Sequence, residues 1–192
     1  MSAEFEHALA FVLANEGGWS DNPADPGGAT MCGISLRFLR ELPPEALRKY
    51  GIFKAPDALM PEDVKELQPA QISMIYHDEF WLKAHLDAFA LKIEWPSISA
   101  YVLDMCVNHG ISQGIKILQR AIWAHYLKRE WAGIIDDGIL GEKTMQELDV
   151  IDSGTFMPVL AAERAGFMRL LCAIHPKDKE FFDGWLDRCY RF

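Results

Sequence analysis

Apolar residues recur at steps of three and four along most of the chain, beginning with Phe5, Leu9 and Val12. This spacing places them on one face of a helix, and Gly17 marks the end of that helix. Residues 20–34 break the pattern, because proline and glycine are concentrated there. We expect this stretch to be a loop or a short irregular hairpin, and no strand is expected elsewhere.

The helical period continues to the end of the chain, divided by prolines and glycines that fit helix starts and ends. A boundary is expected at Pro96, although the flanking Ile93 and Ile98 are apolar. We therefore expect a mainly α fold in which residues 1–95 and 96–192 pack as one body. The further helices are expected over 43–50, 61–67, 69–85, 97–109, 112–131, 155–175 and 179–190, the last capped by Asp178, with another starting near Gly141.

Composition narrows the class of protein. Half of the 192 residues are apolar and 24% are charged, which is typical of a globular protein. Nineteen basic residues against 28 acidic ones give a net charge of −9, so a nucleic acid or an anionic membrane surface would be repelled. The four cysteines show no C-x-x-C spacing, so we expect reduced, mostly buried thiols, no metal site and no cofactor.

The beginning of the sequence lacks the features of an export signal. The apolar run from Ala8 to Ala14 is too short to cross a bilayer, and Glu4 and Glu6 precede it where a signal peptide carries positive charge. We expect a protein that is made in the cytoplasm without a signal peptide and is not stably inserted in the membrane.

Glu16 carries a charge at an unusual position. It follows Val12 by four residues, which puts its carboxylate on or beside the apolar face, in the last turn before Gly17. The negative end of the helix dipole and the apolar neighbours both favour the protonated form of such a group. A carboxyl group that keeps its proton near neutral pH can serve as a general acid. The alternative is an exposed glutamate before a glycine cap.

Two polar residues on the following loop complete a candidate catalytic site. Asp25 and Thr30 lie in a segment that Gly27 and its neighbour allow to fold back over the end of the first helix. Glycoside hydrolysis needs a proton donor and a second carboxylate, and Glu16 and Asp25 would supply them while Thr30 orients water. Otherwise Asp25 is a turn residue and Thr30 is a strand residue.

Short motifs follow one another in a fixed order along nearly the whole chain. The first group is Glu16-Gly17-Gly18-Trp19, Asp25-Pro26-Gly27-Gly28-Ala29-Thr30, Gly33-Ile34, Ile75-Tyr76, Phe80-Trp81, Asp104, Val107-Asn108-His109-Gly110 and Leu118-Gln119-Arg120. The second group is Asp137-Gly138-Ile139-Leu140-Gly141 with Thr144, Glu163-Arg164, Pro176, Phe181 and Gly184-Trp185 with Arg188. The first group resembles glycoside hydrolase family 108, whose members are N-acetylmuramidases, many of them phage endolysins. The second resembles the peptidoglycan-binding region that usually follows in this family.

The resemblance implies a lysozyme-like α fold that cleaves the β-1,4 bond between N-acetylmuramic acid and N-acetylglucosamine, with Glu16 as the proton donor. It implies that residues 1–95 are catalytic and residues 96–192 bind peptidoglycan. The expected partners are the glycan strands of peptidoglycan. A holin or an exporter would give the protein access to them, and we expect the protein to act as a monomer. Phage lysis and local remodelling of the bacterial wall would use the same chemistry.

A saccharide groove is usually lined by flat aromatic rings and hydrogen-bonding side chains. The substrate-binding candidates are Trp19, beside the acid, with Tyr76, Trp81, Asn108 and His109. At helical spacing Tyr76 and Trp81 also fit core positions, and Asn108 also fits a helix end.

Two residues near the end of the chain are expected to be structural. Trp185 and Arg188 lie three residues apart and therefore share one helix face. Stacking, or an ion pair with Glu163, is the expected role for them rather than catalysis.

Two alternatives to a muramidase stay open. A cell-wall amidase or peptidase would use Cys106 with His109, or a metal, although neither this spacing nor that of His77 and His85 makes a recognised site. A non-catalytic wall-binding or secretion-accessory protein would keep the groove without needing a proton on Glu16.

Overall fold

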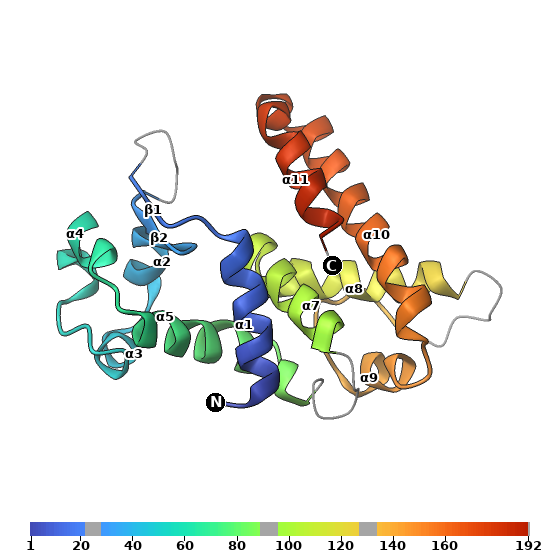
Figure 1. Ribbon diagram of the computed structural model, residues 1–192, viewed down its shortest axis with the longest axis horizontal. Helices are drawn as coiled ribbons and strands as arrows, with labels where there is room; N and C mark the ends of the chain where they lie inside the picture. The colour runs from blue at the N-terminus through green and yellow to red at the C-terminus, as the bar shows by residue number, and fades with distance from the viewer. Residues whose placement is uncertain (22–27, 89–95, 127–133, 192) are drawn as a thin grey trace.

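The computed structural model describes residues 1–21, 28–88, 96–126 and 134–191. Helices make up most of it, so the expected mainly α, lysozyme-like fold is confirmed. Figure 1 shows the helices and the small sheet in their spatial arrangement. The helical segments of the first half are α1 (Ala3–Asn15), α2 (Leu36–Glu41), α3 (Pro44–Lys49), η1 (Pro56–Ala58), α4 (Pro61–Lys65), α5 (Pro69–Tyr76) and η2 (His77–Leu82). Those of the second half are α7 (Pro96–His109), α8 (Ile111–His125), α9 (Glu142–Leu148), α10 (Ser153–Ile174), η3 (Pro176–Phe181) and α11 (Phe182–Cys189).

Helix α1 is the amphipathic helix that the sequence predicts. Ser2 caps its start, because its hydroxyl accepts a hydrogen bond from the backbone N–H of Phe5. The apolar face is buried, with Phe5, Ala8 and Val12 each at 0% exposure. The helix ends at Glu16, whose backbone N–H still bonds to the carbonyl of Val12.

A three-stranded antiparallel sheet follows α1. It lies where the sequence predicts a loop or a short irregular hairpin. Its strands are β1 (Trp19–Ser20), β2 (Thr30–Met31) and β3 (Ile34–Ser35), in the order β1-β2-β3. The connection between β2 and β3 consists of Cys32 and Gly33, with φ of 49° and 80°. Two successive positive φ values are the pattern of a type I′ turn, which matches the twist of a tight hairpin.

Within the described residues, the structure departs from the sequence-based helices at several places, one of which is η1, a short helix that was not expected. Helix α2 was not expected; it begins directly after β3, where the Ser35 hydroxyl accepts from the Phe38 backbone. The helix expected over 69–85 changes to a π-helix at His77. The expected cap at Asp178 is wrong, because this residue lies inside η3, which starts at Pro176.

A continuous core joins the two halves of the chain. One cluster of buried side chains runs from Phe5 in α1 to Ala161 in α10. Helix α7 packs against α1 on one side and against α8 on the other. The α7–α8 contact is close at Gly114, where a Cβ would lie 2.9 Å from the backbone nitrogen of Cys106.

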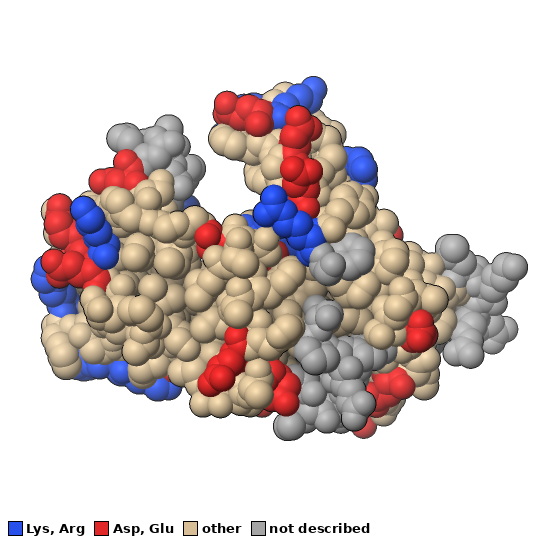
Figure 2. Space-filling model, viewed as in Figure 1, with Lys and Arg blue, Asp and Glu red and all other residues tan. Residues whose placement is uncertain are grey.

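The segment α10–η3–α11 forms a helical hairpin that projects from this core (Figure 1). Figure 2 shows a hollow between the hairpin and the side of the molecule that carries the sheet, with acidic atoms at its floor. Helix α1 ends at this hollow (Figure 1). Among the helices that the structure describes, none has the length and apolar character needed to span a membrane.

Candidate active site

Glu16 lies at the junction of α1 with the loop to the sheet. It is the C-cap residue of α1, with extended backbone angles (φ −88°, ψ 144°). Its side chain is 15% exposed, so the carboxylate is mostly screened from water but still reachable. The carboxyl group therefore lies at the end of the first helix, directly after its last turn. Its catalytic role stays a prediction.

The β2–β3 turn closes one side of the Glu16 carboxylate. A Cβ placed on Gly33 would lie 2.8 Å from Glu16 Oε2 and 2.6 Å from the Tyr76 hydroxyl. Any side chain at this position would collide with both groups, and φ of 80° also favours glycine. The Tyr76 hydroxyl donates to the carbonyl of Cys32 at 2.7 Å, which fixes the turn. Burial, followed by the charge of Glu16, raises the pKa of Tyr76 above its usual value, so the hydroxyl keeps its proton.

Arg188 of α11 approaches Glu16 from the hairpin. Its Nη2 lies 2.5 Å from Glu16 Oε1 and 2.7 Å from Asp104 Oδ1, while its Nε donates to Asp104 Oδ2 at 3.1 Å. Burial acts to lower the pKa of Arg188, but the hydrogen bonds and charges of Asp104 and Glu16 outweigh it and raise the pKa, so the guanidinium stays charged.

Behind Arg188, a second arginine completes a four-membered charge network. Arg164 of α10 donates to Asp104 Oδ2 at 2.7 Å, and both side chains are fully buried. Glu16, Arg188, Asp104 and Arg164 carry two positive and two negative charges, so the network is neutral when all four are ionised. Buried charges that are paired in this way avoid most of the desolvation cost of an isolated ion.

The prediction that Arg188 would pair with Glu163 is wrong, because its partners are Glu16 and Asp104. Glu16 and Arg188 are separated by 172 residues along the chain. Spacing patterns on a helix relate only residues a few positions apart, so they could not predict this pair. Asp104 and Arg188 do occur among the family-like motifs, but the motifs do not say which residues pair.

His109 lies at the far end of the same network. Its Nε2 accepts a long hydrogen bond of 3.4 Å from Arg164 Nε, and its ring packs edge-on against Phe167. Burial, reinforced by the positive charge of Arg164, lowers the pKa of His109 to about 3. The imidazole is therefore neutral near pH 7. The neighbouring Asn108 is exposed at the end of α7, and its role in binding stays a prediction.

The three aromatic candidates lie in different environments. Trp81 is 1% exposed and packs against Phe5, which is the core position that the sequence left open as an alternative. Tyr76 is 0% exposed and acts on the turn next to Glu16. Trp19 is partly exposed in β1, with the Lys65 ammonium 5.6 Å from its ring centre. Of these three rings, the one that reaches the surface is therefore Trp19.

The two other catalytic candidates belong to the loop and the sheet. Thr30 is the first residue of β2, where it pairs with Ser20 and Ser35. The sheet thus brings the strand of Thr30 beside the segment that follows Glu16. Asp25 lies outside the described residues, and its role stays a prediction.

The cysteines do not provide the nucleophile that a cell-wall amidase or peptidase would need. All four are described and free, and three of them are buried. Cys106 is 0% exposed, and burial raises its pKa to about 12. A thiol with this pKa carries almost no thiolate at neutral pH and is a poor nucleophile.

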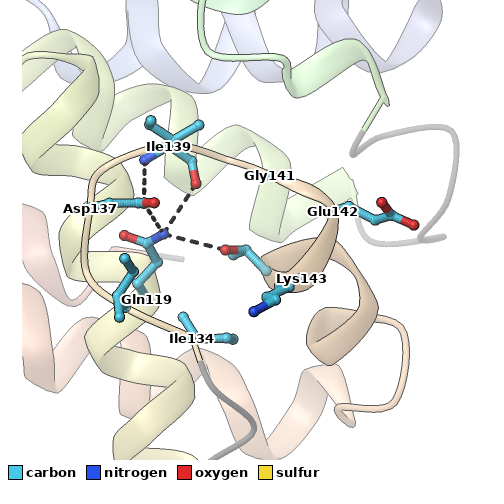
Figure 3. Close-up of a pocket in the computed structure, with 9 residues that line it drawn as sticks. Gln119, Ile134, Asp137, Ile139, Gly141, Glu142 and Lys143 are labelled. Atoms are coloured by element: carbon cyan, nitrogen blue, oxygen red, sulfur yellow. Dashed lines mark hydrogen bonds between the residues drawn. The ribbon is translucent and has the colours of Figure 1, made fainter.

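A separate pocket of about 310 Å³ lies by Gln119 of α8. Figure 3 shows the Gln119 amide beside Asp137 and Ile139, and Thr144 also lies within hydrogen-bond distance of it. Its nitrogen donates to all three, and its oxygen accepts from the backbone of Gly138. The motif Leu118-Gln119-Arg120 and the motif that begins at Asp137 therefore form one hydrogen-bonded unit. Because the amide is fully satisfied by the protein, we assign it a structural role.

Comparisons with known proteins agree with this architecture. The family model described as Glycosyl hydrolase 108 matches residues 9–110. Ten chains of known structure match as well. One of them is described as "Structure of Brucella abortus SagA", with 25% sequence identity, a TM-score of 0.69, and an alignment over 96% of this chain and 88% of that one. No curated protein sequence matches. Because the family model covers more than half of the residues, the chain belongs to the glycosyl hydrolase 108 family of glycoside hydrolases.

Proposed function

We propose that this protein is an N-acetylmuramidase that cleaves the β-1,4 bond between N-acetylmuramic acid and N-acetylglucosamine in peptidoglycan, with Glu16 as the general acid. The observation that carries the proposal is the mostly buried carboxylate of Glu16, enclosed by the Gly33 turn and by Arg188. Membership of the family supports hydrolysis of a glycosidic bond.

The charge network explains how Glu16 would act as a proton donor. When Glu16 protonates the glycosidic oxygen, it becomes a carboxylate next to the guanidinium of Arg188. The guanidinium therefore faces the negative charge that the proton transfer leaves on Glu16. Asp104 holds the guanidinium in place during this step through two hydrogen bonds, and Arg164 in turn binds Asp104.

Asp25 and Thr30 are the proposed partners of the acid. Asp25 would either attack the sugar carbon or activate a water molecule, and Thr30 would orient that water. A separation of the two carboxyl groups of about 5 Å favours retention at the anomeric carbon, and roughly 6.5 to 9.5 Å favours inversion. The stereochemistry of the product therefore reports which role Asp25 has.

The proposed substrate places the site of action at the cell wall. The protein would reach the wall through a membrane lesion, such as one that a holin opens, or through a dedicated exporter. We propose that it acts as a monomer, in host lysis by a phage or in local remodelling of the wall.

Digestion of purified sacculi with the wild-type protein and Glu16→Gln tests the proposal. The glutamine keeps an oxygen that accepts from Arg188, so the fold is retained, but it has no acidic proton. Loss of general acid catalysis is typically worth about 10² to 10⁴ in rate. Mass spectrometry of the wild-type digest is expected to show fragments that end in a reducing N-acetylmuramic acid.

Glu6→Gln is the matched control, because Glu6 is an exposed glutamate on the same helix. Its variant is expected to retain full activity. More than roughly a tenth of wild-type activity in Glu16→Gln would reject Glu16 as the acid. Binding to sacculi without new reducing ends would instead support a non-catalytic wall-binding protein.

A further inference from the structure

The turn between β2 and β3 is held by both backbone groups of Cys32. The Cys32 N–H donates to the carbonyl of Gly18 at 3.4 Å, and the Cys32 carbonyl accepts from the Tyr76 hydroxyl at 2.7 Å. Cys32 has a φ of 49°, in the left-handed region that costs energy for any residue with a side chain and needs support from its surroundings. The hydrogen bond from Tyr76 therefore stabilises the turn in this conformation.

The Glu16 carboxyl group is confined between this turn and Arg188. Arg188 Nη2 donates to Glu16 Oε1. The Gly33 backbone closes on the other oxygen, since a Cβ on Gly33 would lie 2.8 Å from Glu16 Oε2. A change in the position of the turn would therefore change the space around Oε2.

Tyr76 reaches the turn from the protein core. Its side chain is 0% exposed, and its ring centre lies 5.6 Å from that of Phe80. A sugar could not stack on this ring without rearrangement of the close-packed core. The Tyr76 hydroxyl nevertheless lies close to the acid, because a Cβ on Gly33 would be 2.6 Å from it as well.

We infer that Tyr76 is a positioning residue for general acid catalysis: by holding the Cys32 carbonyl, it keeps the turn against Glu16 and so fixes the oxygen that delivers the proton. This inference rests on the proposed function, in which Glu16 is the acid. A guanidinium has donors and no acceptor, so the acidic proton belongs on Oε2, the oxygen beside the turn, and not on Oε1. Tyr76 thus acts on protonation of the leaving group and not on binding of the sugar.

Tyr76→Phe tests the inference, because it removes the hydroxyl and keeps the buried ring. On peptidoglycan strands we expect kcat to fall about tenfold with KM nearly unchanged; a 1 Å misplacement of a reacting group can cost about 10²-fold. On an aryl β-glycoside of the same sugars, whose phenolate leaves without a proton, kcat/KM should change by less than about twofold. A loss of folded protein would lower both activities alike.

Tyr50→Phe is the matched control. Tyr50 is also a buried tyrosine whose hydroxyl donates at 2.7 Å, but its acceptor is Glu79 Oε1, which is not part of the proposed site. We expect this variant to lose stability, measured as the midpoint of urea unfolding, and to keep the wild-type kcat and KM on both substrates. Loss of a buried tyrosine hydroxyl is therefore not enough by itself to reproduce the selective effect.

Gly33→Ala is a second variant, which keeps the inference testable if Tyr76→Phe does not fold. Its methyl group would enter the space between the Tyr76 hydroxyl and Glu16 Oε2, and the φ of 80° disfavours any side chain. Displacement of the turn should give the same selective loss on peptidoglycan strands, about tenfold or more. A folded Gly33→Ala protein with wild-type kcat on strands would overturn the inference.

A folded Tyr76→Phe protein that keeps the wild-type kcat, or that loses both activities alike, would also overturn the positioning role. So would a rise in KM at unchanged kcat, because it would assign Tyr76 to sugar binding. Glu16→Gln separates this failure from failure of the proposed function, since it should lose activity on strands and keep kcat/KM on the aryl glycoside. A Glu16→Gln protein that keeps both activities, or loses both alike, overturns the proposed acid whatever Tyr76→Phe does.

Discussion

At the scale of residues, Glu16 is defined by neighbours that approach it from opposite sides. The Gly33 turn leaves no room for a side chain, and Arg188 supplies a counter-ion. The sequence allowed Glu16 to be picked out, because helix periodicity and the following glycines are local signals. It did not reveal Arg188 as its partner, because an ion pair between chain ends depends on how several helices pack. Sequence spacing also could not separate a groove position from a core position for Trp81.

Arg188 gives the first prediction at this scale. Arg188→Gln removes the guanidinium that bridges Glu16 and Asp104, so activity should fall about tenfold or more because the proposed acid loses its positioning contact. Arg188→Lys keeps the charge but not the planar fork, so it should retain more activity than Arg188→Gln.

Arg191→Gln serves as the control for this experiment, because Arg191 is exposed and follows the same helix. The melting temperatures of the variants, measured in parallel, distinguish loss of positioning from loss of the folded state. Wild-type activity in a folded Arg188→Gln protein would show that the ion pair does not influence the reaction.

At the scale of elements, packing determines where helices begin and how closely they approach. The long helices could be predicted because their apolar residues repeat every three or four positions over many turns. Helix α2 has only six residues, too few for such a repeat, and depends on the Ser35 cap and on contacts with β3. The hairpin of α10 and α11 was expected as two helices, but its projection from the core is a property of tertiary packing.

The α7–α8 contact provides a prediction about elements. Gly114→Ala should destabilise the protein by about 1 to 3 kcal/mol, because the new Cβ would lie 2.9 Å from backbone atoms of Cys106, which cannot rotate away. Gly166→Ala is the matched variant, since this helical glycine of α10 has open space around it. It should stabilise the protein by about 0.5 to 1 kcal/mol. Urea unfolding measures both changes, and equal effects of the two variants would contradict the close contact.

At the scale of the whole molecule, the candidate site belongs to both halves of the chain. The family match passes residue 95 and ends at Gly110. Glu16 comes from the first half, while Asp104 and Arg188 come from the second. Sequence motifs suggested a catalytic half followed by a binding half. The ion pairs show that the second half supplies the groups that hold the proposed acid. The division into a catalytic and a binding half stays a prediction.

The same network makes the stability of the whole molecule depend on pH. His109 has a pKa of about 3 in the folded protein against 6.5 for an ordinary histidine, so between these values the unfolded state binds one more proton. Stability should therefore fall as the pH drops from about 6.5 toward 3, by about 1 kcal/mol per pH unit from this group. Asp63 and Asp78 have lowered pKa values and add to the loss only below about pH 4.

His109→Gln isolates this contribution, because glutamine is neutral in both states and can still accept a hydrogen bond from Arg164. The free energy of unfolding of this variant, measured in urea from pH 4.5 to 7, should vary less with pH than that of the wild type. His7→Gln is the control, since His7 is exposed, and it should keep the wild-type slope. If His109→Gln also keeps the wild-type slope, His109 titrates alike in both states and its burial against Arg164 does not keep it neutral.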